Sequence, residues 1–243
     1  MQLHPILQQL YDTQKVHDKD GNEREAFGPC LIIDDGVALQ ECIRRFDAKR
    51  TLEIGCAYGA STLFMCEALL EIGGRHEAID PYQHDIWGDI GVDTIDKAGF
   101  SDMFTLHRGF SQDVLPKFLV AGEKFDFIFI DGCHLFDYTI TDFFYADKLI
   151  EPGNHIMLHD ILYPSVRKAV SYIVRNMHYE IAMEPFLVKP SLLGRMYTTA
   201  RLAITSPFEP GTWHLASNWW QKNFCVLRKI KNDDRKHELY TPF

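Results

Sequence analysis

The sequence lacks several features that would assign it to a class of protein at once. Its six cysteines contain no C-x-x-C pair, which argues against a zinc site and a thioredoxin-like motif. Its 25 basic residues form no cluster and are outnumbered by 34 acidic ones; the formal net charge of −9 argues against a nucleic-acid partner. No window approaches the run of about 18 apolar residues that a membrane-spanning helix needs, so we expect no membrane partner.

The N-terminal residues also lack the pattern of a signal peptide. The first residues, MQLHPILQQLYDTQ, do not follow the charged-then-apolar pattern of a secretory leader. Several cysteines lie at apolar positions of expected helices and strands, where a free thiol behaves as a small hydrophobic side chain. We therefore expect a cytoplasmic protein with reduced cysteines.

What the chain does contain is a regular alternation of strand and helix patterns. With 243 residues, 46% of them hydrophobic, it can bury one sizeable core, and one large α/β domain is favoured over two small ones. Five strand–helix units in succession predict a Rossmann-like, doubly wound and mostly parallel seven-stranded sheet with helices on both faces. The expected strands are 51–54, 76–80, 103–107, 125–131 and 155–160, and the expected helices are 61–72, 89–98, 112–121, 136–150 and 165–177. We expect Pro152-Gly153 to stop the helix at 136–150.

The two ends of the chain break this rhythm. Helical spacing predicts an N-terminal helix at residues 3–10, and another helix at 39–46. The polar segment 15–29 predicts a linker or lid-like loop. After residue 178, strands are expected at 179–183 and 198–205. An aromatic tail from Gly211, with Trp213, Ala216, Trp220, Phe224 and Leu227 at rough helical spacing, predicts a helix and a homo-oligomer surface. The expected division is thus 1–29, 30–205 and 206–243.

The stretch TLEIGCAYGAST at residues 51–62 contains the most informative turn. Its spacing is E-x-G-x-x-x-G rather than the G-x-G-x-x-G that exposes a helix N-terminus to a pyrophosphate. Gly55 and Gly59 allow a tight turn and a close approach to a ligand. The carboxylate of Glu53 would repel a pyrophosphate and suits a cationic group such as an ammonium.

Several further motifs follow in order: HEAIDPYQ, FDFIFIDGCHLFDYTITDFFYAD, IEPGNHIMLHDI and PSVRKAV. Together with the first turn, they make residues 30–205 resemble the class I S-adenosylmethionine-dependent methyltransferases. The resemblance is to the small-molecule O-methyltransferase branch that includes macrolide-sugar O-methyltransferases and cephalosporin-biosynthesis relatives. It implies a methyl transfer from S-adenosyl-L-methionine to a small-molecule substrate, at a hydroxyl oxygen.

The resemblance also implies which residues bind the cofactor. The first turn would line the methionine part, Asp80 would accept hydrogen bonds from the ribose hydroxyls, and Phe110 and Ser111 would flank the adenine. Phe110 stands where the family commonly has an acid. The complete expected set is Glu53, Gly55, Ala57, Gly59, Ser61, Asp80, Phe110, Ser111 and Asp131.

Polar residues at the ends of two expected strands suit the chemistry of the transfer. Asp131 ends the strand at 125–131, with His134 three residues later, and His159 and Asp160 end the strand at 155–160. We expect these strand ends to open onto one cleft. Two mechanisms remain open. His134 acts as general base, with Asp131 and Asp160 as its partners, or Asp131, His159 and Asp160 hold Mg²⁺ or another divalent cation. The histidine in place of a second acid weakens the Mg²⁺ alternative and favours a softer metal or none.

Other candidates are given structural roles at this stage. Cys133 and the aromatic cluster at 143–145 are expected in the core, and His84 and Trp87 beside the cofactor. Two other classes of function stay open: a nicotinamide-dependent oxidoreductase, against which Glu53 and the missing G-x-G-x-x-G argue, and a non-catalytic cofactor-binding protein. An N- or C-methyltransferase is a third alternative, because a ready-made nucleophile needs neither base nor metal.

Overall fold

The computed structural model describes residues 3–26, 30–182, 196, 200, 222–237 and 241–242. The chain divides into two compact units, 1–128 and 129–243, with the boundary inside strand β6 (Phe125–Ile130). Among the described residues, the main sheet has seven strands in the order β5-β4-β3-β6-β7-β9-β8. The expected α/β fold class is confirmed.

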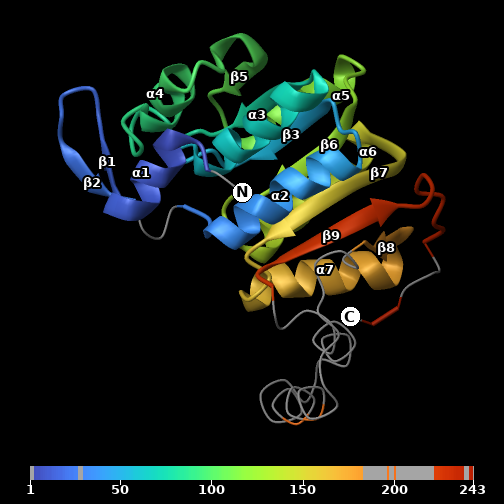
Figure 1. Ribbon diagram of the computed structural model, residues 1–243. Coiled ribbons are helices and arrows are strands. Elements are labelled where there is room, and N and C mark those ends of the chain that lie inside the picture. Colours follow the sequence, from blue (N-terminus) through green and yellow to red (C-terminus); the bar gives the residue numbers. More distant parts are fainter. Residues whose placement is uncertain are drawn as a thin grey trace. The chain divides into compact units, whose positions relative to one another are not determined.

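The first unit carries the strand–helix alternation expected from the sequence (Figure 1). Its elements are α2 (Ile33–Arg45), β3 (Arg50–Ile54), α3 (Ala60–Ile72), β4 (Arg75–Ile79), α4 (Ile90–Lys97), the 3₁₀ turn η1 (Ser101–Met103), β5 (Phe104–His107) and α5 (Ser111–Val120). Strands β3, β4 and β5 pair in parallel. Helix α3 is buried over most of its length and packs against α2. This packing fixes the turn between β3 and α3, where the cofactor residues are expected.

The expected N-terminal helix is confirmed, but the prediction of a loop after it is wrong. Helix α1 (Pro5–Thr13) is followed by a two-stranded hairpin of β1 (Lys15–His17) and β2 (Glu23–Glu25). The Asp18 carboxylate accepts the backbone N–H groups of Asp20 and Asn22 and so shapes the hairpin turn. Val16 is the one buried residue of these two strands, so their other positions can hold polar side chains. Residues 27–29 of the expected segment lie outside the described residues.

The second unit holds α6 (Phe136–Leu149), β7 (Ile150–His159), α7 (Pro164–Asn176), β8 (Tyr179–Ile181) and β9 (Phe224–Lys229). The helix expected at 136–150 is confirmed as α6. Pro152-Gly153 does not stop it, however, because β7 begins at Ile150 and runs through the Pro-Gly pair. Proline and glycine fit there because Glu151, Pro152 and Gly153 are exposed, and glycine freely adopts the φ of 98° found at Gly153.

The helix expected in the C-terminal tail is wrong over the residues that the structure describes. Residues 224–229 form β9, which pairs antiparallel with both β7 and β8. Phe224, Cys225, Val226 and Leu227 are all buried, as in a strand covered on both faces, so their helical spacing in the sequence was fortuitous. Trp213, Ala216 and Trp220 lie outside the described residues. So does the strand expected at 198–205, apart from Ala200, which is helical.

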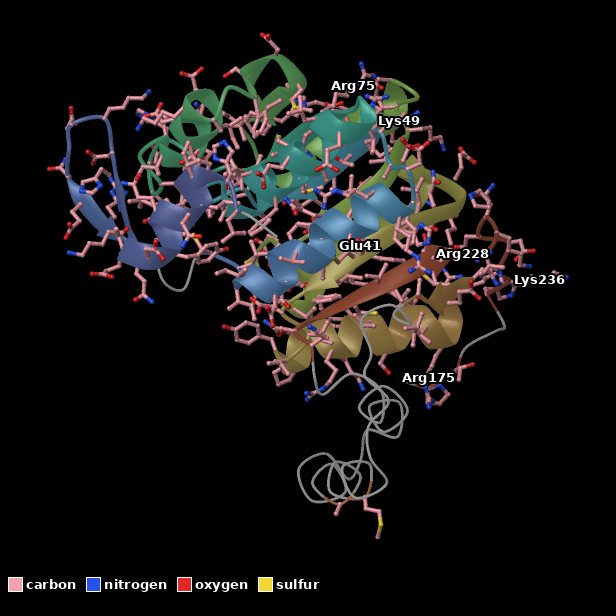
Figure 2. The ribbon with its side chains drawn as sticks, in the orientation of Figure 1. Glu41, Lys49, Arg75, Arg175, Arg228 and Lys236 are labelled. Atoms are coloured by element: carbon pink, nitrogen blue, oxygen red, sulfur yellow. The ribbon has the colours of Figure 1, made fainter. Side chains whose placement is uncertain are left out.

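A buried histidine on β7 makes the second unit sensitive to acid. His155 faces Arg228, which is labelled in Figure 2, across the β7–β9 pairing. Burial and the charge of Arg228 lower the pKa of His155 to about 4. An unfolded histidine titrates near pH 6.5, so protons then bind the unfolded chain first as the pH falls. The free energy of unfolding should therefore drop by about 3 kcal/mol between pH 6.5 and 4, with no further loss from this group below pH 4.

Urea unfolding from pH 7 to 4 measures this loss. The slope should be reduced in His155→Gln and kept in His84→Gln, a control on an exposed side chain. Identical slopes in His155→Gln and the parent would show that His155 does not cause the loss.

Among the described residues, no helix combines the length and the apolar character needed to cross a membrane.

Candidate functional site

The turn between β3 and α3 is an unusual piece of backbone. Gly55, Ala57 and Gly59 all have positive φ angles, of 98°, 45° and 80°. Glycine adopts such angles freely, but alanine does so at a cost of order 1–3 kcal/mol, and such outliers gather at ligand sites. A Cβ on Gly59 would lie 2.9 Å from the carbonyl oxygen of Gly91. The glycine spacing noted in the sequence is therefore required by both conformation and close packing.

Asp80 holds this turn from the end of β4. Its Oδ2 accepts the backbone N–H groups of Cys56 and Ala57, at 3.1 and 2.8 Å, and the side-chain amide of Gln83 at 3.1 Å. Its Oδ1 accepts the N–H of Tyr82 at 2.8 Å. Asp80 thus ties the loop after β4 to the loop after β3. A role toward ribose hydroxyls stays a prediction, for which Oδ1, with one hydrogen-bond partner among the described residues, has acceptor capacity left.

Glu53 lies on β3 directly below the turn and is fully buried. Its Oε2 accepts a hydrogen bond from Thr62 and lies 3.1 Å from His76 Nε2, while His76 Nδ1 lies 2.8 Å from Thr51 Oγ1. Glu53 Oε1 has no hydrogen-bond partner within the described residues. A buried carboxylate oxygen without a donor costs free energy. It suits a ligand that brings a donor or positive charge to this position.

Three more of the expected cofactor residues, Ser61, Phe110 and Ser111, lie at the starts of helices in the first unit. Ser61 is buried in the first turn of α3, and Ser111 is buried as the first residue of α5. Phe110 is exposed and meets Tyr82 edge to face, with ring centroids 5.8 Å apart. Two exposed rings at the ends of β4 and β5 suit a planar group such as a purine.

Two residues of this region escaped the sequence reasoning. Gln83 donates from Nε2 to the carbonyl oxygen of Ala57, at 2.6 Å, as well as to Asp80. Gly91, in the first turn of α4, lies so close to the turn that a Cβ on it would meet the Ala57 carbonyl at 2.5 Å. Gln83 ends the DPYQ run and Gly91 follows it, but neither residue type is diagnostic of this role.

A second group of polar residues lies in the second unit, at the ends of β6 and β7. His134 Nε2 lies 3.1 Å from Asp131 Oδ1 and 3.1 Å from Asp160 Oδ2. His159 Nδ1 also lies 3.1 Å from Asp131 Oδ1. The structure thus brings together the four residues expected from the two strand ends. Asp131, His134 and Asp160 are hereafter called the polar cluster.

The charges within the polar cluster support one another. Burial alone would lower the pKa of His134, but the hydrogen bond and charge of Asp131 and the charge of Asp160 raise it above its usual value. Burial works against the charged form of Asp131 too, yet His159 and His134 together lower the pKa of its carboxyl. An imidazolium at position 134 is therefore stabilised by two carboxylates, the arrangement in which a histidine can take up a proton.

The backbone at the polar cluster is strained. His134 and Asp160 have φ angles of 58° and 56°, in the left-handed region that non-glycine residues rarely occupy. Local bonds hold both: Ser165 Oγ donates to the His134 carbonyl, and the Tyr163 N–H donates to the Asp160 carbonyl at 2.9 Å. Strain of this kind points to selection for side-chain position rather than for stability.

The same three side chains form a possible cation site. One ligand atom from each of Asp131, His134 and Asp160 lies within 4.8 Å of the others. His159, expected from the sequence as the third ligand, is buried beside Asp131 instead, and Phe129 lies near its ring. In this structure His134 takes the place that the sequence reasoning gave to His159.

Three exposed apolar side chains lie close to the polar cluster in the sequence. Leu135, Leu162 and Tyr163 are 53%, 62% and 53% exposed. The Tyr163 ring lies 5.5 Å from the His134 ring, at an interplanar angle of 37°. Cys133, expected in the core, is exposed, because it lies in the turn after β6 rather than on the strand. Such a rim suits an acceptor with an apolar or aromatic body.

The other residues singled out in the sequence lie in different environments. Phe143 is buried as expected, but Phe144 is exposed and its ring lies under the Lys148 ammonium. His84 is exposed and contacts Asp89, and Trp87 meets Tyr58 edge to face. Trp87 thus touches the turn between β3 and α3 through Tyr58, and the role of His84 and Trp87 beside the cofactor stays a prediction.

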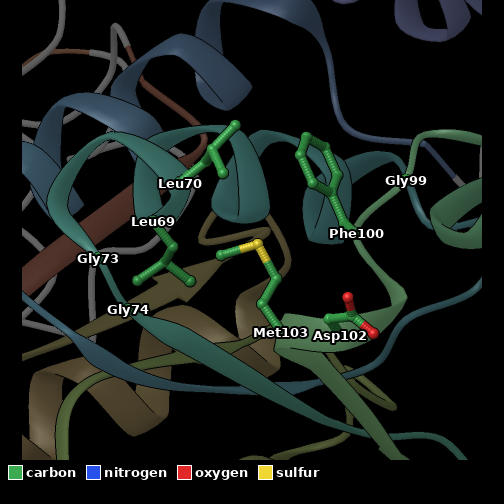
Figure 3. A pocket seen from close by; sticks show the side chains of 8 residues that line it. All are labelled: Leu69, Leu70, Gly73, Gly74, Gly99, Phe100, Asp102 and Met103. Atoms are coloured by element: carbon green, nitrogen blue, oxygen red, sulfur yellow. The ribbon is translucent and has the colours of Figure 1, made fainter.

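A pocket in the first unit lies away from these residues (Figure 3). It is lined where α3 ends and β5 begins, by Leu69, Leu70, Gly73, Gly74, Gly99, Phe100, Asp102 and Met103. This is at the amino ends of β4 and β5, whereas Asp80 follows the carboxyl end of β4. Ligands of open α/β sheets bind at carboxyl ends, so we assign the pocket no role.

Comparison with known proteins agrees with this geometry. Residues 52–161 match a family model described as a methyltransferase domain. The chain is 29% identical over 150 residues to a catechol O-methyltransferase from Niastella koreensis, covering 57% of this chain and 62% of that protein. It is 35% identical over 131 residues to caffeoyl-CoA O-methyltransferase 1 from Arabidopsis thaliana, covering 51% of this chain and 49% of that protein. The matches thus span about half to three-fifths of these relatives.

Solved structures share the fold. The O-methyltransferase from Bacillus cereus, in complex with SAH, has a TM-score of 0.59 at 21% identity, covering 75% of this chain and 84% of that chain. TomG from Streptomyces achromogenes, an O-methyltransferase involved in tomaymycin synthesis and crystallised with SAM, has a TM-score of 0.64 at 17% identity, covering 94% and 91%. The resemblance to methyltransferases predicted from the sequence is confirmed.

Proposed function

We propose that this chain is an S-adenosylmethionine-dependent methyltransferase that methylates a hydroxyl group of a small molecule. The observation that carries the proposal is the polar cluster: a histidine between two carboxylates at the ends of adjacent strands, in a chain whose residues 52–161 match a methyltransferase domain. An acceptor hydroxyl must lose its proton during transfer, and the cluster offers a group to take it.

The first turn fits the proposed cofactor. S-adenosylmethionine supplies an electrophilic methyl group and carries an ammonium. The buried Oε1 of Glu53, which has no hydrogen-bond partner in the described part of the chain, suits a donor of that kind. The close packing of Gly59 and Gly91 fixes the turn before any ligand arrives. We propose that Glu53 and the turn hold the methionine part, that Asp80 holds the ribose, and that Tyr82 and Phe110 flank the adenine.

His134 is the proposed general base. Its Nε2 faces Asp131 and Asp160, so Nε2–H donates to the carboxylates and Nδ1 takes the proton from the acceptor. The two carboxylates then stabilise the imidazolium that forms, as an orienting carboxylate does in other base–carboxylate pairs. The methyl group passes to the acceptor oxygen by in-line displacement, for which the protein mainly supplies alignment.

A divalent cation is the second candidate mechanism, favoured by the three ligand atoms within 4.8 Å. These residues fit a cation, and the imidazole nitrogen favours a transition ion such as Mn²⁺ over Mg²⁺. A bound cation would lower the pKa of the acceptor hydroxyl. His134 Nε2 cannot carry a proton and ligate a cation at once, so the two mechanisms exclude each other.

Metal titration separates these mechanisms. If the cluster holds a cation, calorimetry with MnCl₂ shows stoichiometric binding that Asp131→Asn abolishes, binding releases a proton, and EDTA stops turnover. The general-base mechanism predicts no such binding and turnover unchanged by EDTA. We expect the second result, because His134 Nε2 lies within hydrogen-bonding distance of both carboxylates, which favours a proton on that nitrogen rather than a cation.

The exposed rim supports an aromatic acceptor. Tyr163 and its neighbours Leu135 and Leu162 offer an apolar surface beside His134. The relatives named above are a catechol and a caffeoyl-CoA O-methyltransferase. We propose a phenolic hydroxyl as the acceptor. Residues 30–205 as the methyltransferase domain, a cytoplasmic location and a homo-oligomer remain predictions.

Labelled methyl transfer tests the proposed function. S-adenosylmethionine with a ¹⁴C-methyl group is incubated with a panel of phenols, sugars and amines, and the products are separated by chromatography. We expect label on one or more phenols and none on amines. Label only on amines or carbon would replace the proposal with N- or C-methylation.

A further inference from the structure

We infer that Asn223 is a positioning residue of the polar cluster, holding the Asp160 carboxylate in the orientation that serves His134. This inference rests on the proposed function. Asn223 lies 62 residues beyond the segment that matches the methyltransferase domain, immediately before β9. Nothing in the sequence motifs points to it, because a lone asparagine in a tail has no diagnostic spacing.

The contacts of Asn223 divide into two sets. Its side-chain Nδ2 donates to Asp160 Oδ1 at 2.5 Å. Its Oδ1 accepts the backbone N–H of Leu162 at 3.3 Å, and its main-chain carbonyl accepts the N–H of Ile161 at 3.2 Å. Nδ2 thus acts on the carboxylate of the cluster, whereas the two oxygen atoms hold the loop that follows it.

The two oxygens of Asp160 have different partners. Oδ1 receives the Asn223 amide, and Oδ2 lies 3.1 Å from His134 Nε2. A carboxylate is free to rotate about its last side-chain torsion unless something fixes it. Because Asn223 binds one oxygen, the other is directed at the imidazole. The pairing matters more here because Asp160 has a left-handed backbone that sets its Cβ in an unusual direction.

The alternative is that Asn223 only stabilises the loop at 160–162. In that case the oxygen contacts matter, and the amide donor is incidental. The two roles can be separated because aspartate is nearly isosteric with asparagine. An aspartate at 223 keeps an oxygen for the Leu162 N–H and leaves the main-chain bond intact, but it has no donor for Asp160 and adds a like charge beside it.

Three variants test the inference: Asn223→Asp, Asn223→Ala and the control Asn176→Ala. Asn176 is also an asparagine of the second unit that bridges distant segments, through bonds to Thr241, and it lies away from the cluster. Turnover is measured with ¹⁴C-labelled S-adenosylmethionine and the best phenol of the panel. Cofactor affinity is measured by calorimetry with S-adenosylhomocysteine.

A positioning role predicts that Asn223→Asp lowers kcat by at least about tenfold, and that this loss is at least as large as the loss in Asn223→Ala. The cofactor affinity of Asn223→Asp should stay within about twofold of the parent. Asn176→Ala should lower the melting temperature and keep kcat. If Asn223→Asp retains the parent kcat while Asn223→Ala loses stability, the residue only holds the loop, and the inference is overturned.

A second readout does not depend on turnover, so it tests the inference even if the proposed function is wrong. Long-range ¹H–¹⁵N spectra report the environment of the His134 imidazole, whose signal is assigned by its loss in His134→Gln. At one fixed pH, that signal should move in Asn223→Asp and stay in place in Asn176→Ala. An unmoved signal in Asn223→Asp would refute the positioning role even if no acceptor is methylated. Absence of cofactor binding in the parent would instead refute the proposed function.

Discussion

Replacing His134 with alanine should lower turnover by about a hundredfold or more while leaving the affinity for S-adenosylhomocysteine nearly unchanged. The reason is that His134, between Asp131 and Asp160, is proposed to take the acceptor proton, whereas the turn held by Asp80 is proposed to bind the cofactor. The control is His178→Ala, which also removes an imidazole paired with an aspartate, Asp234, but outside the cluster. It should keep most of its activity.

The pH–rate profile of the parent gives a second check on His134. Its pKa is raised above 6.5, so the group is protonated below that value and becomes able to accept a proton only as the pH rises through it. Turnover should therefore rise along a limb lying above pH 6.5, and the limb should vanish in His134→Ala. A limb that survives in the variant would belong to the acceptor, as expected for an amine. Full activity at every pH would remove His134 from the mechanism.

Replacing Asp80 with alanine should weaken binding of S-adenosylhomocysteine by more than about tenfold, a loss of about 1.4 kcal/mol or more. Four hydrogen bonds end on this carboxylate, two of them from the backbone of the strained turn at Cys56 and Ala57. Their loss frees the turn and leaves buried donors without acceptors. Calorimetry measures the affinity, and the melting temperature in the presence of ligand gives an independent estimate.

Asp126 provides the matched control for Asp80. Its carboxylate also accepts two backbone N–H groups, from Lys49 and Arg50, but at the opposite end of β3. Asp126→Ala also removes a carboxylate that accepts two backbone N–H groups, so it should lower stability. It should leave the affinity for S-adenosylhomocysteine unchanged. If both variants weaken binding equally, the effect of Asp80→Ala is general destabilisation rather than loss of the turn.

Much of the fold and part of the site could be predicted from the sequence because they depend on local patterns. The run FDFIFID is apolar enough to mark a strand buried on both faces, and Asp131 at its end is then placed by topology. Gly55 and Gly59 report a tight turn directly, and their positive φ angles agree. Asp131, His134, His159 and Asp160 come together because β6 and β7 are neighbours in the sheet and these four residues end or follow those two strands.

What could not be predicted depends on contacts between distant parts of the chain. Asn223 meets Asp160 only because β9 pairs with β7, and β9 itself was hidden by a fortuitous helical spacing. The hairpin at 15–25 is polar, so its single buried residue, Val16, left no alternating pattern. The choice between His134 and His159 as the third member of the polar cluster rests on side-chain direction, which residue spacing does not give.

Calorimetric titration of the parent protein with S-adenosylhomocysteine tests the central claim most directly, because it needs no acceptor. The account predicts saturable binding of one ligand per chain, weakened by Asp80→Ala and unchanged by His134→Ala, with no heat from NADH. Tight binding of NADH together with no response to S-adenosylhomocysteine would contradict it.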